Sequence, residues 1–266
     1  MNCSARIIPP CSLVRGTEPY SHSRLSVFEK CPYRYRLQYI DKVEVEERQG
    51  IEAVTGTLVH ECLEHVYAQS QEGALVPWED LVARLRSRWD ELVDDTVVVV
   101  KRGVSKQDYL FQAQHMLLAY YRKHRPFDQH RTVGLEHELT FEVRGRPFIG
   151  YIDRLSSPSP GVYEIHDYKT GKRLPTAQDL RADRQLALYE LGVRQAFPDA
   201  REVHLVWHYL AYDRELRSSR TAEELVELER RTEGLIQRIE NETDFPKRTG
   251  PLCRWCEYEQ VCRGQT

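Results

Sequence analysis

The stretch GYIDRLSSPSPGVYEIHDYKTGK, residues 150–172, decides the fold because it contains two alternating segments around a turn. Apolar and aromatic side chains recur with a period of two over residues 147–155 and again over 162–168, and Pro158–Gly161 supplies the turn between them. This spacing predicts two neighbouring antiparallel strands.

Each of these two strands carries a carboxylate. Asp153 lies in the first strand, Asp167 lies in the second, and Lys169 follows two residues later. Since successive side chains of a strand point to opposite faces, Asp167 and Lys169 are expected on the same face. Two carboxylates on adjacent strands can hold Mg²⁺ or Mn²⁺ and leave positions open for water and phosphate. The lysine can then activate the water or stabilise charge on the phosphate. Charged residues two apart are also common on a solvated strand face, so this pattern alone is weak evidence for an active site.

The rest of the sequence places these strands in a mixed sheet flanked by helices. Period-two alternation predicts further strands at residues 133–143 and 203–210. Helical periodicity predicts helices that begin near Ser23, divided by Pro32, and at Thr55 or Thr57, and further helices over 78–93, 106–124, 176–196 and 221–240. We therefore expect an α/β (α+β) fold with an N-terminal helical elaboration.

The length of 266 residues favours one compact unit. We expect residues 1–22 to be an irregular lead-in and 23–266 to form a single domain. Its helical part spans about 54–125, its catalytic core about 130–212, and its C-terminal helix and cysteine segment 221–266.

Composition indicates an ordinary globular protein, with 41% hydrophobic and 30% charged residues. The longest purely apolar run, Val97–Val100, is far too short to cross a membrane, and the first residues lack the pattern of a secretory signal. We therefore expect a cytoplasmic protein without a membrane span. The net charge of −3 gives no global attraction to nucleic acid, so DNA binding would need local basic patches.

Four motifs together carry a family resemblance. They are GTLVH at 56–60, GYIDR at 150–154, DYKTGK at 167–172 and QLALY at 185–189. In this order they resemble the RecB-like branch of the PD-(D/E)XK nucleases, which includes AddB-type nuclease domains, mitochondrial exonucleases and CRISPR-adaptation nucleases. The resemblance implies a restriction-endonuclease-like core. It departs from the superfamily name at Ile152, which stands where a proline would precede the aspartate.

The resemblance also assigns site residues. It implies that His60, Asp153 and Asp167 bind Mg²⁺ or Mn²⁺, helped by the main-chain carbonyl of Tyr168. Lys169 would be the catalytic lysine. It further implies that Gln185 and Tyr189, one helical turn apart, position the substrate or the lysine.

A second pattern consists of four cysteines near the two ends of the chain. Cys31 is followed by proline, and Cys253, Cys256 and Cys262 form a C-x2-C-x5-C segment. Four thiolates can hold either Zn²⁺ or a [4Fe–4S] cluster, and the spacing does not separate the two. The single cysteine followed by three is similar to the iron–sulfur staple of the RecB-like nucleases, which favours the cluster. The other three cysteines, Cys3, Cys11 and Cys62, receive no role.

Basic and aromatic residues flank these cysteines. Tyr33, Arg34, Arg36 and Trp255 suit the stacking of bases and the binding of phosphates in single-stranded DNA, although they could equally pack around the cysteines.

The function expected from the resemblance is that of a single-strand DNA exonuclease or end-trimming enzyme in DNA repair or recombination. The alternatives are a CRISPR-adaptation nuclease that works with an integrase partner, and an inactive nucleic-acid-binding relative. The sequence contains no GxxxxGK[ST] motif, so a helicase partner would be a separate chain.

Overall fold

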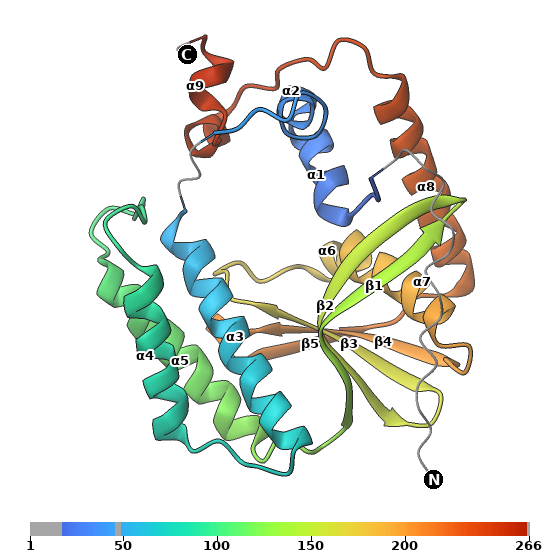
Figure 1. Ribbon diagram of the computed structural model, residues 1–266. Helices are drawn as coiled ribbons and strands as arrows, with labels where there is room; N and C mark the ends of the chain where they lie inside the picture. The colour runs from blue at the N-terminus through green and yellow to red at the C-terminus, as the bar shows by residue number, and fades with distance from the viewer. Residues whose placement is uncertain (1–17, 46–48, 265–266) are drawn as a thin grey trace.

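The computed structural model describes residues 18–45 and 49–264, which form a five-stranded sheet between helical layers (Figure 1). In chain order, the elements are α1 (His22–Lys30), α2 (Pro32–Tyr35), the π-helix η1 (Arg36–Ile40), α3 (Ile51–Gln71), α4 (Trp78–Leu92), α5 (Lys106–His124), β1 (Arg131–Val143), β2 (Arg146–Ser159), β3 (Val162–Lys169), α6 (Ala177–Arg181), α7 (Arg184–Ala196), β4 (Glu202–Tyr209), the 3₁₀ helix η2 (Leu210–Tyr212), β5 (Arg214–Ser218), α8 (Ala222–Asn241), the 3₁₀ helix η3 (Pro251–Trp255) and α9 (Glu259–Cys262).

The sheet is mixed, with the strand order β1-β2-β3-β4-β5. The first three strands pair antiparallel, β4 lies parallel to β3, and β5 pairs antiparallel with β4. This arrangement confirms the expected fold class. The fifth strand was not predicted, because its sequence RELRS has no apolar alternation. A left-handed turn at Asp213 (φ 47°) brings β5 back against β4.

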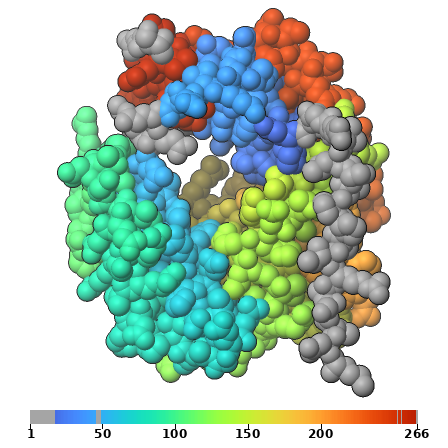
Figure 2. Space-filling model, viewed as in Figure 1, coloured from blue at the N-terminus to red at the C-terminus, as the bar shows by residue number. Residues whose placement is uncertain are grey.

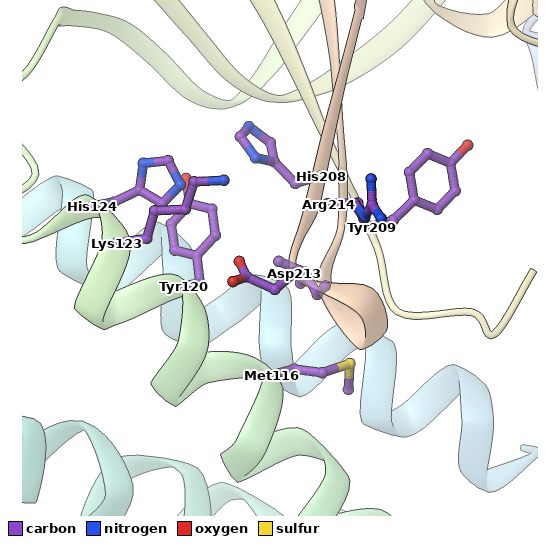
Figure 3. Close-up of a pocket in the computed structure, with 9 residues that line it drawn as sticks. Met116, Tyr120, Lys123, His124, His208, Tyr209, Asp213 and Arg214 are labelled. Atoms are coloured by element: carbon purple, nitrogen blue, oxygen red, sulfur yellow. The ribbon is translucent and has the colours of Figure 1, made fainter. Parts of the chain in front are cut away.

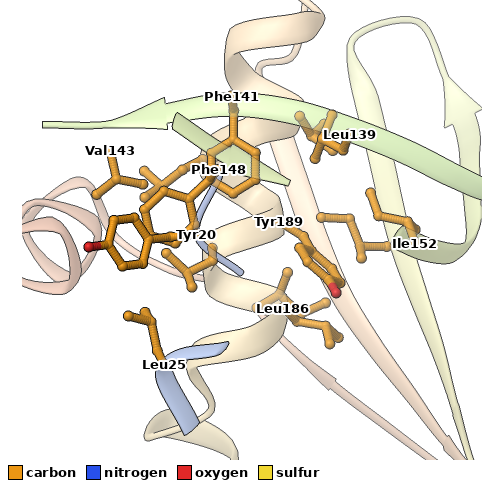
Figure 4. Packing of buried hydrophobic residues seen from close by; sticks show 14 of the residues in the cluster. Tyr20, Leu25, Leu139, Phe141, Val143, Phe148, Ile152, Leu186 and Tyr189 are labelled. Carbon is orange, nitrogen blue, oxygen red and sulfur yellow. The ribbon is translucent and has the colours of Figure 1, made fainter. Parts of the chain in front are cut away.

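Two hydrophobic cores cover the two faces of the sheet. One packs α1, α7 and α8 against the strands. Figure 4 shows its side chains, among them Leu139 and Phe141 of β1 and Leu186 of α7. The other core packs α3, α4 and α5 against the opposite face, where Tyr168 of β3 joins them. Alternation along β3 explains the division, since Ile165 belongs to the first core and Tyr168 to the second.

Several helix boundaries differ from the prediction. The first helix is capped by Ser21, whose hydroxyl accepts from the Arg24 N–H, and not by Ser23. As expected, Pro32 divides the helix, since α1 ends at Lys30 and α2 begins at the proline. Helix α3 begins at Ile51, before both predicted threonine caps.

The helix predicted over 176–196 is two helices in the structure. Thr176 caps α6, and Asp183 caps α7 by accepting from the Leu186 N–H at 3.0 Å. Because Asp183 is an N-cap residue, the chain begins a new helix there and α6 is not extended.

The predicted domain limits remain a prediction. Most of the expected lead-in, residues 1–17, lies outside the described residues. Among the described helices, none is long and apolar enough to span a membrane.

Two helical glycines allow a test of the packing between α7 and the sheet. A Cβ on Gly192 of α7 would lie 2.4 Å from Leu139 Cδ2, whereas a Cβ on Gly234 of α8 would meet nothing within 4 Å. Both Gly→Ala changes gain helix propensity, so their difference isolates the overpacking. We expect Gly192→Ala to be less stable to urea than Gly234→Ala by about 1–3 kcal/mol. Equal unfolding midpoints would contradict this tight contact.

Candidate active site

The register between β2 and β3 brings the two motif aspartates together. Arg154 pairs with His166 in this antiparallel ladder. Asp153 precedes Arg154 and Asp167 follows His166, so the two aspartates occupy the next position on neighbouring strands. The Asp153 Oδ2 atom accepts a hydrogen bond of 2.7 Å from the main-chain N–H of Tyr168. The two strands therefore hold both carboxylates at the same end of the sheet.

His60 reaches this point from α3. Its Nε2 atom lies 2.7 Å from the Tyr168 carbonyl oxygen and, because that oxygen can only accept, Nε2 carries the proton. In the neutral ring, Nδ1 then keeps its lone pair, and this atom lies 3.6 Å from Asp153 Oδ2. A metal-binding histidine commonly donates its other ring N–H to a carbonyl in this way.

A further acidic residue, Glu136 of β1, completes a compact group that the sequence analysis did not identify. The ligand atoms of His60, Glu136 and Asp153 all lie within 4.8 Å of one another. We call these three residues the metal-ligand group. The register sets Leu135 opposite Arg154 and His137 opposite Ile152, so Glu136 faces Asp153 across the strand pair. Glu136 has a left-handed backbone (φ 40°), a strained conformation in a strand.

Lys169 lies beside this group and forms an ion pair with Asp167. Its Nζ atom is 2.8 Å from Asp167 Oδ2 and 3.4 Å from Gln185 Oε1, and Gln185 in turn donates to the Tyr189 hydroxyl at 3.4 Å. Gln185 and Tyr189 are one turn apart on α7, as their spacing predicts. The structure therefore gathers every predicted catalytic side chain into one contiguous set.

Gly150 makes room for Tyr189. A Cβ at this position would lie 2.3 Å from Cε1 of the tyrosine ring, well inside any normal contact. The glycine that opens the GYIDR motif therefore allows the tyrosine ring to pack directly against β2.

The electrostatics of the site favour a cation. Burial, opposed by His60 and assisted by the neighbouring Asp167, raises the pKa of Asp153 to about 7. Burial also raises the pKa of Glu136. For Lys169, burial opposes the charged form, but Asp167 more than compensates and raises the pKa. The lysine is therefore protonated at neutral pH, and the carboxylates lack a full counter-charge.

The donor set fits a hard divalent ion. Two carboxylates and one imidazole provide ligands, with Asp167 and the Tyr168 carbonyl next to them. Such oxygen-rich sets bind Mg²⁺ or Mn²⁺. Asp167 lies outside the metal-ligand group and pairs with Lys169, so its predicted role as a ligand remains a prediction, as does that of the carbonyl.

Comparison with known proteins identifies the family. The family model of the PD-(D/E)XK nuclease superfamily matches residues 19–263. This chain belongs to that superfamily. A comparison with curated proteins finds no match.

One solved structure supports the fold of this nuclease, and a second was found with lower similarity. The crystal structure of a protein from Eubacterium rectale, described as a putative exonuclease, is similar with a TM-score of 0.50 and 16% identity over 94% of each chain. A structure of the protein SSO0001 has a TM-score of 0.36 and 16% identity, covering 91% of this chain and 96% of the other.

The four cysteines of the nuclease do not form a compact group. Among the described residues, some groups of three metal-binding side chains have ligand atoms within 4.8 Å of one another. These groups contain histidine and carboxylate residues and no cysteine. The two cysteine segments nevertheless contact each other. Cys31 Sγ accepts from the Arg248 N–H at 3.5 Å, and Arg34 forms an ion pair of 2.8 Å with Glu257. Cys62 lies elsewhere, buried in α3, while Cys3 and Cys11 are outside the described residues.

The candidate DNA-binding residues already have partners. Arg34 is paired with Glu257, and Arg36 forms an ion pair of 3.0 Å with Asp41. The Lys247 ammonium lies 4.8 Å from the centre of the Tyr33 ring. The side chain of Trp255 lies outside the described part of the chain. A DNA phosphate would have to displace an acidic partner from each arginine, and the assignment of these residues remains a prediction.

The raised pKa of Asp153 predicts pH-dependent metal binding. Since its value is about 7, binding below that pH must displace a proton. We expect the Mn²⁺ association constant to fall by up to about tenfold per pH unit below pH 7 and to level off above it. Calorimetric titrations between pH 5.5 and 8.5 measure this dependence. Asp153→Asn should bind weakly with a shallower profile, and an unchanged slope would contradict the assignment.

Proposed function

We propose that this nuclease is a divalent-metal-dependent DNA exonuclease or end-trimming enzyme that acts on single strands. The observation that carries the proposal is the gathering of His60, Glu136 and Asp153 beside the Asp167–Lys169 pair. This places an ion site next to a fixed positive charge, which is the arrangement that phosphodiester hydrolysis needs.

The chain's residues have separable roles in this reaction. His60, Glu136 and Asp153 would hold the ion, with the Tyr168 carbonyl fixing the histidine ring. A bound Mg²⁺ or Mn²⁺ polarises the phosphate and lowers the pKa of its bound water.

Lys169 stabilises the charge that develops on the phosphate oxygens. Asp167 and Gln185 hold its ammonium in place, and its raised pKa keeps it charged, so it serves as a cation and not as a base. Tyr189, at the end of this hydrogen-bonded series, is positioned to touch the substrate.

The shape of the molecule supports a single strand as the substrate. Figure 2 shows an opening between α3 on one side, α1 and α2 above, and the β1–β2 strand pair on the other side. Two of these walls carry site residues, since His60 lies on α3 and Asp153 on β2. A strand that enters such an opening would do so by an end, which suits trimming.

Removal of the lysine charge tests the proposed active site. Lys169→Ala should lower the cleavage rate by roughly 10²–10³-fold, the usual loss for one group that stabilises a transition-state charge. Lys172→Ala, three residues away and exposed, is the matched control and should cleave normally. The assay uses single- and double-stranded DNA labelled at either end, with Mg²⁺ or Mn²⁺.

Undiminished cleavage by Lys169→Ala would remove the lysine from the mechanism. A wild-type protein that binds DNA but does not cleave it with either ion would instead identify an inactive relative. Equal rates on single and double strands would contradict the preference for single strands.

We also propose that Cys31, Cys253, Cys256 and Cys262 hold a structural [4Fe–4S] cluster. Four thiolates on one Zn²⁺ would lie about 3.8 Å apart, given a Zn–S bond of about 2.3 Å, whereas a cube of iron and sulfur binds each thiolate to a different iron and spreads them more widely. The N–H groups of Arg248 and Gly250 point to Cys31 Sγ and Cys253 Sγ, as is common around cluster thiolates. Since N–H groups donate to the thiolates of either metal, it is the wide separation of the sulfurs that favours iron over zinc.

Metal analysis of anaerobically purified protein tests the cluster. We expect about four iron and four sulfide per chain, as in a [4Fe–4S] centre, and a large loss of iron in Cys31→Ala. Cys62→Ala removes a cysteine from outside the set and should keep its iron. Zinc in place of iron, or full iron content in Cys31→Ala, would contradict the assignment.

A further inference from the structure

A second group of metal-binding side chains lies on the α5 side of the sheet and shares no residue with the candidate active site. It consists of His124 at the end of α5, His208 on β4 and Glu215 on β5, and their ligand atoms all lie within 4.8 Å of one another. Figure 3 shows His124 and His208 projecting toward the same pocket from their two elements. We call these three residues the distal histidine site. The nuclease mechanism uses none of them.

The distal histidine site has polar atoms without suitable protein partners. His124 Nε2 is buried and has no hydrogen-bond partner. His208 is only 3% exposed, and its Nδ1 lies 3.8 Å from Glu215 Oε2, which is too long for a hydrogen bond. The other Glu215 oxygen, Oε1, accepts from Arg217 at 2.7 Å. A buried nitrogen without a hydrogen bond is costly, and a cation shared with His208 and Glu215 would satisfy His124 Nε2.

The space at this site matches a small ligand. A cavity of about 10 Å³ is lined by His124 and His208, and this volume admits about one water molecule. Asp213 contributes a carboxylate to the lining, and Lys123 and Arg214 contribute positive charge, while Glu215 lies outside the lining. The cavity can therefore supply the water that often completes the coordination of a metal with three protein ligands.

We propose that His124, His208 and Glu215 bind a transition-metal dication, with Zn²⁺ as the preferred ion. Two imidazoles and one carboxylate favour zinc over Mg²⁺, which prefers an all-oxygen shell. The metal-ligand group of the candidate active site has two carboxylates and one imidazole, so oxygen ligands predominate there.

The surroundings support this assignment. Burial lowers the pKa of His124 to about 4 and that of His208 well below its usual value, and a neutral imidazole is the form that binds metals. His208 Nε2 lies 3.0 Å from His166 Nδ1, a contact that fixes the orientation of the ligand ring.

The ion would join the helical layer to the edge of the sheet. His124 is the last residue of α5, and the two other ligands come from the adjacent strands β4 and β5. The Tyr120 ring stacks on His124 with a centroid separation of 4.0 Å and holds it over the strands. The bound ion therefore acts as a structural clamp.

Zinc content, compared between matched variants, tests the proposal. The full-length protein, with its native cysteine-bound metal, is exposed to Zn²⁺ in excess Mg²⁺ and freed of unbound metal by gel filtration. We expect His124→Ala and Glu215→Gln each to contain one zinc equivalent fewer than the wild type. Asp213→Asn, which changes a cavity residue outside the three ligands and keeps a side chain that tolerates its left-handed backbone, should match the wild type.

Two further measurements separate this ion from other bound metals. His60→Ala changes the catalytic group only, so it should keep the zinc equivalent that His124→Ala loses. Added Zn²⁺ should raise the melting temperature of the wild type and of His60→Ala, but not that of His124→Ala. Cobalt substitution should give visible absorption from a nitrogen and oxygen environment, without the intense near-ultraviolet bands of thiolate ligands.

Identical zinc contents in the wild type, His124→Ala and Glu215→Gln would overturn the proposal. The same conclusion would follow if cobalt absorption in the wild type came only from thiolate ligands. The three side chains would then be polar neighbours that share no ion. Because neither readout measures DNA cleavage, the result is independent of the proposed nuclease function.

Discussion

The structure depends on one strand pairing, that of β2 with β3. With Arg154 opposite His166, the pairing brings Asp153 and Asp167 to the catalytic site and places Arg154 against the Tyr67 ring in the α3–α5 core. A shift of one residue would exchange the two faces of a strand. It would turn the carboxylates toward the α3–α5 core and the arginine toward the candidate active site. The chemistry and the packing of this nuclease therefore require the same register.

This register also explains the polar residues in the α3–α5 core. Arg154, His166 and His208 are each at most 5% exposed, and the arginine Nη2 lies 2.9 Å from His166 Nε2. Buried polar groups are tolerated when their partners are fixed, and here the sheet fixes them. Polar residues at core positions depart from the usual hydrophobic pattern, and such departures in natural proteins occur mainly at functional or strained sites. This polar layer is where the metal clamp is proposed.

The sequence predicted the parts of the structure that depend on local pattern. Period-two alternation located β1 to β4. The motifs named Asp167 and Lys169, which lie in contact, and His60, which lies beside Asp153, although their roles remain predictions. Glu136 was missed because its role arises from pairing across strands, and no spacing along the chain marks it. β5 was missed because its strand character comes from hydrogen bonds to β4 rather than from apolar residues. The distance between the cysteine sulfurs likewise depends on how the two ends of the chain meet.

Gly150 shows that a sequence motif can include a residue whose role is packing. In GYIDR, the aspartate is a proposed ligand, whereas the glycine contributes only clearance for the Tyr189 ring. A single methyl group at this position would push the tyrosine away while every acidic residue and the lysine stayed in place. A related chain could therefore keep every acidic residue and the lysine and still lose the contact between Tyr189 and Gln185.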